Sequence, residues 1–122
     1  MRLRRRDPAE LLPLTPAMFH VLIALGDGEK HGYAIIKEVN HRTGGQLRLG
    51  AGTLYALVRR FLEHGVIEES SQRPDPALDD ERRRYYRLTD FGRDVAAAEG
   101  RRLAELIRMA REKRLVPGTA RS

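Results

Sequence analysis

The chain has 122 residues, a net charge of +6 and a pI of about 10.3, with 41% hydrophobic and 33% charged residues. This composition predicts a soluble globular protein with one modest core, and its basic balance is compatible with a nucleic-acid partner. Because there is no cysteine and no apolar run near the ~20 residues that span a bilayer, we expect no disulfide, no thiolate metal site and no membrane partner, and a cytoplasmic location.

The N-terminal residues 1–13 carry several arginines but no apolar stretch, so they do not have the pattern of a secretory signal. Pro8 and Pro13 should interrupt regular structure. We therefore expect a solvated, flexible arm, with a phosphate-seeking arm as the alternative.

The first helix is predicted to begin at Thr15, a good N-cap, followed by Pro16, whose missing N–H costs nothing in a first turn. It should end at the Gly-Asp-Gly of residues 26–28. Its apolar stripe consists of Met18, Val21, Leu22 and Leu25. Phe19 and Ile23 fall off that stripe, which indicates that a second subunit covers another face of the helix.

The second helix is predicted to run from residues 31–32 to about Thr43, with His31 as a capping residue and a Gly-Gly pair after its end. Its core face is expected to combine Tyr33, Ile36 and Val39, with Ile35 alongside. Residues 46–51 should then cross to the third helix as a short extended piece, because leucines alternate there with polar neighbours.

The third helix, predicted from Gly52 to His64, has one apolar stripe and a basic outer side, and Gly65 can take the left-handed conformation that ends it. The stripe consists of Leu54, Leu57, Val58, Phe61 and Leu62. The outer side carries Thr53, Ala56, Arg59 and Arg60, with Tyr55 beside them. A short helix of this kind, followed at once by a strand, is typical of a recognition helix entering a β-wing.

Two strands and a long helix complete the chain. Residues 66–71 and 82–88 are predicted to pair around an acidic turn at 73–81. Thr89 should cap a last helix over residues 90–115. Its apolar stripe consists of Val95, Leu103, Leu106, Ile107 and Ala110. The simplest cover for this stripe is a second copy of the chain, and folding back on its own subunit is the alternative.

The element order predicts a mainly α protein with a small β-wing, namely a winged helix-turn-helix followed by a C-terminal dimerisation helix. We divide the chain into a basic arm (1–13), a DNA-binding domain (14–89), a dimerisation helix (90–116) and a tail (117–122). The predicted dimer contacts are Phe19, Ile23, Leu103, Leu106, Ile107 and Ala110.

Three stretches, in this order, resemble the PadR family of bacterial transcriptional regulators: HGYAIIKEV at 31–39, GTLYALVRRFLEHGVIEE at 52–69 and RRRYYRLTDFG at 82–92. The resemblance implies a homodimeric repressor of double-stranded DNA, of the short-tailed branch, whose first and last helices build the dimer. It also implies, for some members, a small-molecule effector pocket near that interface. The acidic wing turn and the absence of tryptophan depart from the family pattern, so neither wing contact with the minor groove nor drug sensing carries over.

The predicted DNA contacts follow from the length of each side chain and its position along the third helix. Thr53 lies at the start of the third helix, where a short side chain can approach base edges, whereas Arg59 and Arg60 lie further along, where guanidinium groups clamp phosphates. The full set is Thr53, Tyr55, Ala56, Arg59, Arg60, Arg83 and Arg84. Three alternatives stay open: Tyr55 as a half-buried packing residue, Arg60 as a plain solvated charge, and wing arginines paired with nearby carboxylates.

An enzyme is not expected. The histidines have no metal-ligand spacing, no nucleophile–base set can be assigned, and no cofactor or metal is predicted. The alternative function is a winged helix that serves as a dimeric protein-interaction module without direct DNA binding. Such a module would not need Arg59 and Arg60 on an exposed helix face.

Overall fold

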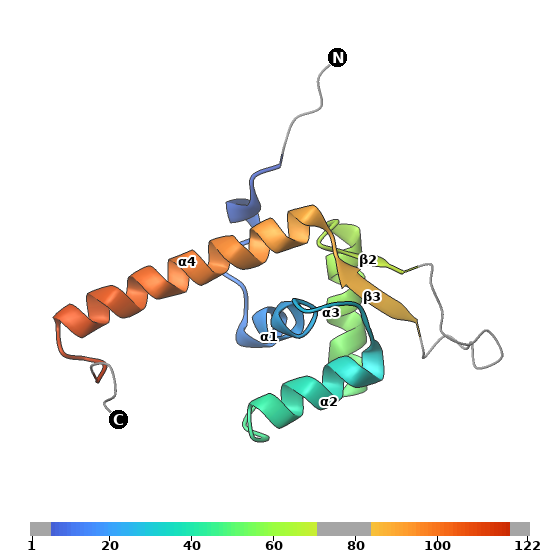
Figure 1. The fold of residues 1–122 in the computed structure, drawn as a ribbon, viewed down its shortest axis with the longest axis horizontal. Helices are drawn as coiled ribbons and strands as arrows, with labels where there is room; N and C mark the ends of the chain where they lie inside the picture. The colour runs from blue at the N-terminus through green and yellow to red at the C-terminus, as the bar shows by residue number, and fades with distance from the viewer. Residues whose placement is uncertain (1–5, 71–83, 118–122) are drawn as a thin grey trace, which may run out of the picture.

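The computed structural model describes residues 6–70 and 84–117 and has the predicted architecture. In chain order the elements are a 3-10 helix η1 (Pro8–Leu11), α1 (Pro16–Ala24), β1 (Lys30–His31), α2 (Gly32–Arg42), α3 (Ala51–Glu63), β2 (Ile67–Glu69), β3 (Tyr85–Leu88) and α4 (Asp90–Glu112). The helices α1, α2 and α3 gather beside the sheet, and α4 starts next to the sheet and runs away from it (Figure 1). The fold is mainly α with a small sheet, as a winged helix requires.

The helix boundaries follow from capping residues in the sequence. Thr15 and Thr89 each accept a hydrogen bond from the N–H three residues further on, at 3.2 and 2.9 Å. His31 caps α2 in the same way, because its Nδ1 accepts the N–H of Ala34 at 3.1 Å. At the end of α3, Gly65 has a φ of +73°, the left-handed conformation that was predicted.

The sheet has three strands in the described chain, rather than the two predicted. The strand β3 lies in the centre and pairs antiparallel with β2 on one side and β1 on the other. The strand β1 has only two residues, too few to show an alternating pattern, and this is why no strand was predicted there. The predicted acidic turn lies outside the described residues, as do residues 82 and 83 of the returning strand.

One apolar core joins all four α-helices to the sheet. Its buried members are Leu14, Val21, Leu22, Ala24, Leu25, Ile35, Val39, Leu49, Leu54, Val58, Phe61, Val66, Ile67, Tyr86 and Val95. Two predicted core residues are exposed, Tyr33 at 66% and Leu62 at 40%, and three more, Met18, Ile36 and Leu57, are half-buried against the core. In α2, Ile35 and Val39 take the inward face instead, so Tyr33 points elsewhere.

The start of α4 lies directly on the end of α3 and the start of β2. Gly92 is buried, and a Cβ atom at this position would collide with the carbonyl oxygen of Val66. The hydroxyl of Thr89 also donates a hydrogen bond to the Gly65 carbonyl at 2.6 Å. The first turn of α4 is therefore fixed to the segment that leaves α3.

The N-terminal segment is more ordered than predicted. The carboxylate of Asp7 caps η1 by accepting the N–H of Ala9 at 2.9 Å, and η1 packs against α4. The guanidinium of Arg6 lies over the ring of Phe91, 4.3 Å from its centroid, and donates to the His64 carbonyl. The prediction of no regular structure is thus wrong for residues 8–11, because Pro8 occupies a first turn, where its missing N–H is not needed.

Glu99 on α4 holds the chain that leads into α1. Its side chain is 1% exposed and accepts the Leu14 N–H at 3.0 Å and the Arg102 Nε–H at 2.6 Å. The hydrogen bond from Arg102 lowers the pKa of Glu99 below its ordinary 4.5, and the Leu14 N–H adds to this, while burial acts in the opposite direction. The ionised form is therefore the one that the fold stabilises.

We predict that Glu99 contributes to acid unfolding. Because its pKa is lower in the folded chain than the ordinary 4.5, its contribution is complete above that value and is lost as the pH falls through the folded pKa. Glu99→Gln should lower the free energy of unfolding at neutral pH by about 1–3 kcal/mol and reduce its fall on acidification. Urea unfolding over a pH series measures both. The exposed Glu63→Gln serves as control, and an unchanged acid dependence in Glu99→Gln would contradict the assignment.

Candidate nucleic-acid interface

The outer face of α3 is exposed along its whole length. Thr53, Ala56, Arg59 and Arg60, four of the predicted contacts, are all exposed, and the 3.6-residue period places them on one side of the helix. Small side chains occupy the N-terminal half of this side and guanidinium groups the C-terminal half. Arg59 and Arg60 have no carboxylate partner among the described residues.

Tyr55 has a packing position instead of an outward one. It is half-buried, and its hydroxyl lies so close to Gly32, the first residue of α2, that a Cβ atom there would collide with it. Tyr55 therefore holds α3 against the start of α2. This is the packing alternative that the sequence left open.

Side chains of α2 and of the residue that follows it fix the turn that leads into α3. The carbonyl oxygen of the Asn40 side chain accepts the Leu49 N–H at 2.9 Å. The Thr43 hydroxyl donates to the Val39 carbonyl at 3.0 Å and accepts the Leu47 N–H at 3.3 Å. The piece predicted as extended at 46–51 ends one residue earlier, because Ala51 already belongs to α3, and these side chains rather than a neighbouring strand satisfy its backbone.

Sequence reasoning missed two residues near this face. Tyr33 and, one turn later, Lys37 are exposed on α2, and Tyr33 directly follows the glycine that Tyr55 contacts. Tyr33 adds an exposed hydroxyl to the first turn of α2, and Lys37 adds an exposed ammonium group near the middle of this helix. The sequence did contain a signal for this. Ile35 and Val39 are four residues apart and so share one helix face, which leaves Tyr33 and Lys37 on another face.

The described arginines of the wing are paired with carboxylates. Arg84 lies 3.1 Å from a carboxylate oxygen of Glu69, and Arg87 lies 2.8 Å from one of Glu68. Both glutamates come from β2, the strand beside β3, rather than from the acidic turn. Arg83, the other predicted wing contact, lies outside the described residues. The base of the wing is therefore close to electrically neutral.

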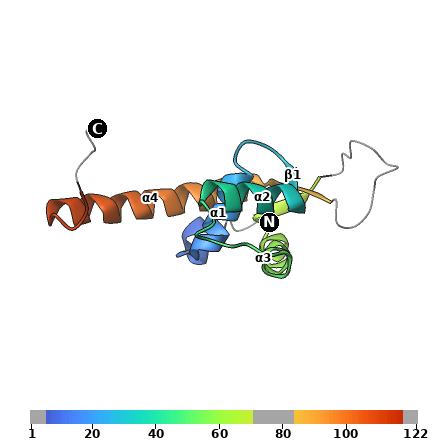
Figure 2. The ribbon, with the colours of Figure 1, turned by 90° about the horizontal axis from the view of Figure 1, so that it is seen from below.

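The C-terminal half of α4 projects beyond the rest of the described chain in both views (Figures 1 and 2). Leu106, Ile107 and Met109 are 47%, 40% and 43% exposed. Among the other predicted dimer contacts, Leu103, Ala110 and Phe19 are half-buried, and Ile23 on α1 is 40% exposed. Met109 was not predicted, because it lies outside the stripe at helical spacing.

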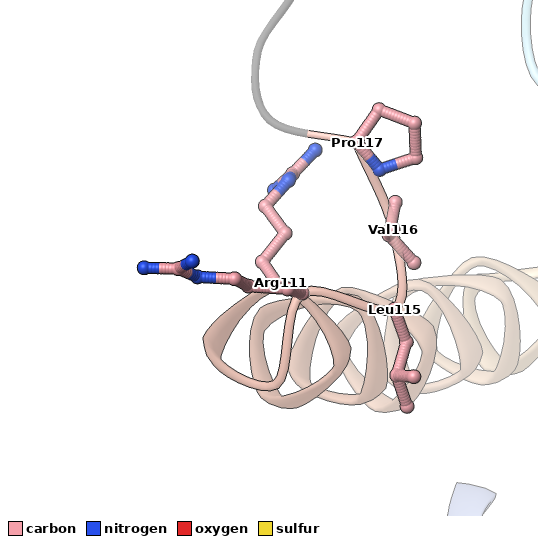
Figure 3. A pocket seen from close by; sticks show the side chains of 5 residues that line it. Arg111, Leu115, Val116 and Pro117 are labelled. Carbon is pink, nitrogen blue, oxygen red and sulfur yellow. The ribbon is translucent and has the colours of Figure 1, made fainter.

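An open pocket lies at the C-terminal end of α4 (Figure 3). It has a volume of about 570 Å³ and is lined by Arg111, Arg114, Leu115, Val116 and Pro117. Both views place this end of α4 far from α3, so the pocket is separate from the outer face of α3. Among residues 6–70 and 84–117 no group of three His, Asp or Glu side chains could hold a metal ion. No helix in the same part of the chain is both long and apolar enough to cross a membrane.

The greater part of the sequence matches a known family. The family model of the transcriptional regulator PadR-like family matches residues 21–98, from α1 into α4. This chain belongs to the PadR-like family. The resemblance of its three motifs to that family is thereby confirmed.

The chain is also similar to individual proteins. The chain is 36% identical over 90 residues to a 37.1 kDa protein in transposon TN4556 of Streptomyces fradiae, and the match covers 74% of this chain and 24% of that protein. It is 30% identical over 73 residues to a Lysinibacillus sphaericus protein X, covering 60% and 64%. The chain thus spans less than two thirds of either relative. The structure of a PadR family transcription regulator from Clostridium difficile shares the fold, with a TM-score of 0.67, 22% identity, and coverage of 80% of this chain and 97% of that one.

We predict that Asn40→Ala loosens the turn before α3. Leu49 is 3% exposed, so its N–H would be left without an acceptor inside the fold, at a cost of about 1–3 kcal/mol in the free energy of unfolding. Hydrogen exchange at the Leu49 amide should accelerate more than global unfolding explains. The exposed neighbour His41→Ala is the matched control. Wild-type exchange at Leu49 in Asn40→Ala would show that this side chain does not hold the turn.

Proposed function

We propose that this PadR-like regulator is a homodimeric repressor that binds specific double-stranded DNA through the outer face of α3. The observation that carries the proposal is the exposed side of α3, on which small residues precede two arginines without carboxylate partners among the described residues. A helix enters the major groove with its N-terminal residues nearest the base edges. Arginines further along then face phosphates.

The two ends of this face have different tasks. Thr53 is short and stands in the first turn of α3, where it can touch a base edge. Arg59 and Arg60 stand about two turns later and neutralise phosphates. The packing of Tyr55 on Gly32 keeps the helix at a fixed angle, so we assign Tyr55 an indirect part in binding. Ala56 lies between the two ends and keeps the face shallow.

The wing has a lesser part in this proposal. Arg84 and Arg87 each have a carboxylate on β2, and an ion pair must be broken or shared before such an arginine can neutralise a phosphate. We therefore assign α3 most of the DNA contact and retain Arg83 and Arg84 as secondary phosphate contacts.

The dimer is assigned to α1 and α4. Leu106 and Ile107 are exposed on a helix that projects from the subunit, and a soluble protein rarely leaves such a stripe uncovered. A second copy with Phe19, Ile23, Leu103 and Ala110 at the same interface would cover it. Residues 14–89 would then be the DNA-binding unit and residues 90–116 the dimerisation helix. A small-molecule effector, where one acts, would bind at this interface and change the spacing of the two α3 helices.

The protein-interaction module is the weaker candidate. It would not need two exposed guanidinium groups on one helix face, whereas Arg59 and Arg60 lie on the α3 face with no carboxylate partner among the described residues. A basic, exposed helix that follows a rigid turn fits a polyanion better than a protein groove.

We predict a division of labour along α3. Arg60→Ala should weaken specific and random DNA by a similar factor and make the slope of log affinity against log salt shallower by about one unit. Thr53→Ala should leave the slope unchanged and lower the ratio of specific to random affinity, by about 1 kcal/mol for each base edge that the hydroxyl no longer reaches. Fluorescence anisotropy with a duplex selected from a random pool, and with its scrambled form, measures both at several salt concentrations.

The charge control for this experiment is Arg101→Ala, which removes an exposed arginine of α4. This variant should keep the wild-type slope of log affinity against log salt and the wild-type ratio of specific to random affinity. A flat salt dependence in the wild type would refute DNA binding. If Arg60→Ala changes specificity while Thr53→Ala changes only the salt slope, the two ends of α3 are assigned the wrong way round.

We predict that charge on the exposed stripe of α4 separates the subunits. Replacing both Leu106 and Ile107 by Glu should give a monomer in sedimentation velocity and lower DNA affinity, because two linked α3 helices would no longer bind together. Leu115→Glu, which charges a 77% exposed leucine beyond the end of α4, is the control and should remain dimeric. If the double variant sediments as the wild type does, the interface lies on another surface.

A further inference from the structure

For most glycines of the described chain, the structure of the subunit itself explains why glycine is needed. Four of them, Gly28, Gly44, Gly45 and Gly65, have the positive φ that other residues rarely adopt. A further three, Gly26, Gly32 and Gly92, have backbone or side-chain atoms so near that a Cβ would be crowded. The remaining three, Gly50, Gly52 and Gly100, have neither property, because a Cβ built on each meets nothing within 4 Å and φ is not positive.

Folding alone would favour a larger residue at these three positions. Glycine in a helix is destabilising relative to alanine, because it loses more backbone freedom on folding. Gly52 lies in the first turn of α3 and Gly100 in the middle of α4. Gly50 is the N-cap of α3 and makes no side-chain capping bond, which a serine or aspartate would provide.

The three positions lie on the surfaces that the proposed function assigns to other molecules. Gly100 precedes Leu103 by one turn on the helix assigned to the dimer. Gly50 and Gly52 flank the first residue of α3, and Gly52 shares a helix face with Ala56 and Arg59, four and seven residues on. All of these α3 residues and Gly50 are exposed.

We infer that Gly52, supported by Gly50, sets how closely the start of α3 approaches the floor of the DNA groove. This inference rests on the proposed DNA binding. Thr53 has a short side chain, so it reaches a base edge only if the backbone beside it comes close, and any side chain at position 52 would hold the backbone away. Arg59 and Arg60 are long and flexible, so they still reach phosphates when the helix sits further out. Gly52 is thus a positioning residue for sequence recognition rather than for general affinity.

The test uses a substitution whose effects on folding and on binding have opposite signs. Gly52→Ala should raise the Tm, because alanine favours the helix and its methyl group meets nothing in the subunit. It should also raise the Kd for the selected duplex about tenfold, equal to about 1.4 kcal/mol, and change the Kd for scrambled DNA little. Gly52→Leu, also a good helix former, should weaken specific binding further because it is larger. Weaker binding by a more stable protein cannot come from unfolding.

Ala51→Gly is the matched control, with the same two residue types exchanged in the opposite direction at the neighbouring exposed position. It should lower the Tm and keep the wild-type ratio of specific to random affinity. If the wild type binds DNA and both Gly52 variants bind the selected duplex as tightly as the wild type does, the inference is overturned while the proposed function stands. A lower Tm in Gly52→Ala would also overturn it, since the glycine would then have an internal role. Absence of DNA binding in the wild type would refute the proposed function itself.

Discussion

The orientation of α3 depends on the contact between Tyr55 and Gly32. The ring of Tyr55 occupies the space that any side chain at position 32 would need, so the first half of α3 lies directly against the first turn of α2. The neighbouring His31 caps the same turn with Nδ1 and packs edge-on against the ring of Tyr85, 5.4 Å between centroids. One small area therefore joins α2, α3 and the central strand of the sheet, and this packing positions the start of α3.

The other end of α3 is tied to α4 and to the N-terminal segment. Gly65 ends the helix, Thr89 donates to its carbonyl, and Gly92 lets α4 start against Val66. Arg6 adds a bond to the His64 carbonyl while it covers Phe91. A movement of α4 relative to a second subunit would thus be transmitted to α3 through packed backbone and not through a flexible linker. In the proposed dimer, this arrangement would give an effector at the interface a physical route to the outer face of α3.

Local signals in the sequence predicted the parts of the fold that local chemistry determines. Thr15, His31 and Thr89 were recognisable as caps because each side chain bonds a backbone group within three residues. The outer face of α3 could be predicted for the same reason, since helical spacing alone separates Thr53 and Arg60 from the buried stripe. Helix and strand patterns predicted the element order, and the PadR motifs then indicated the family, which the family model confirms. Contacts between distant segments escaped prediction. Glu99 bonds a backbone N–H that lies 85 positions earlier in the chain, and no periodicity marks such a pair. The strand β1 likewise forms only through its pairing with β3.

The net charge of +6 does not by itself locate a DNA-binding surface, because many arginines of the described chain are matched by carboxylates. Arg102 and Arg108 on α4 pair with glutamates one turn away, and Arg87 pairs with Glu68 across the sheet. The hydrogen bonds that Arg102 donates to Glu99 and Arg108 donates to Glu105, the largest causes, raise the pKa of both guanidinium groups. Arg59 and Arg60 lack such partners in the described chain. A phosphate that meets them displaces only water and counterions, whereas one that meets Arg87 competes with an existing carboxylate. On the outer face of α3, this readiness for a polyanion coincides with small residues that allow close approach.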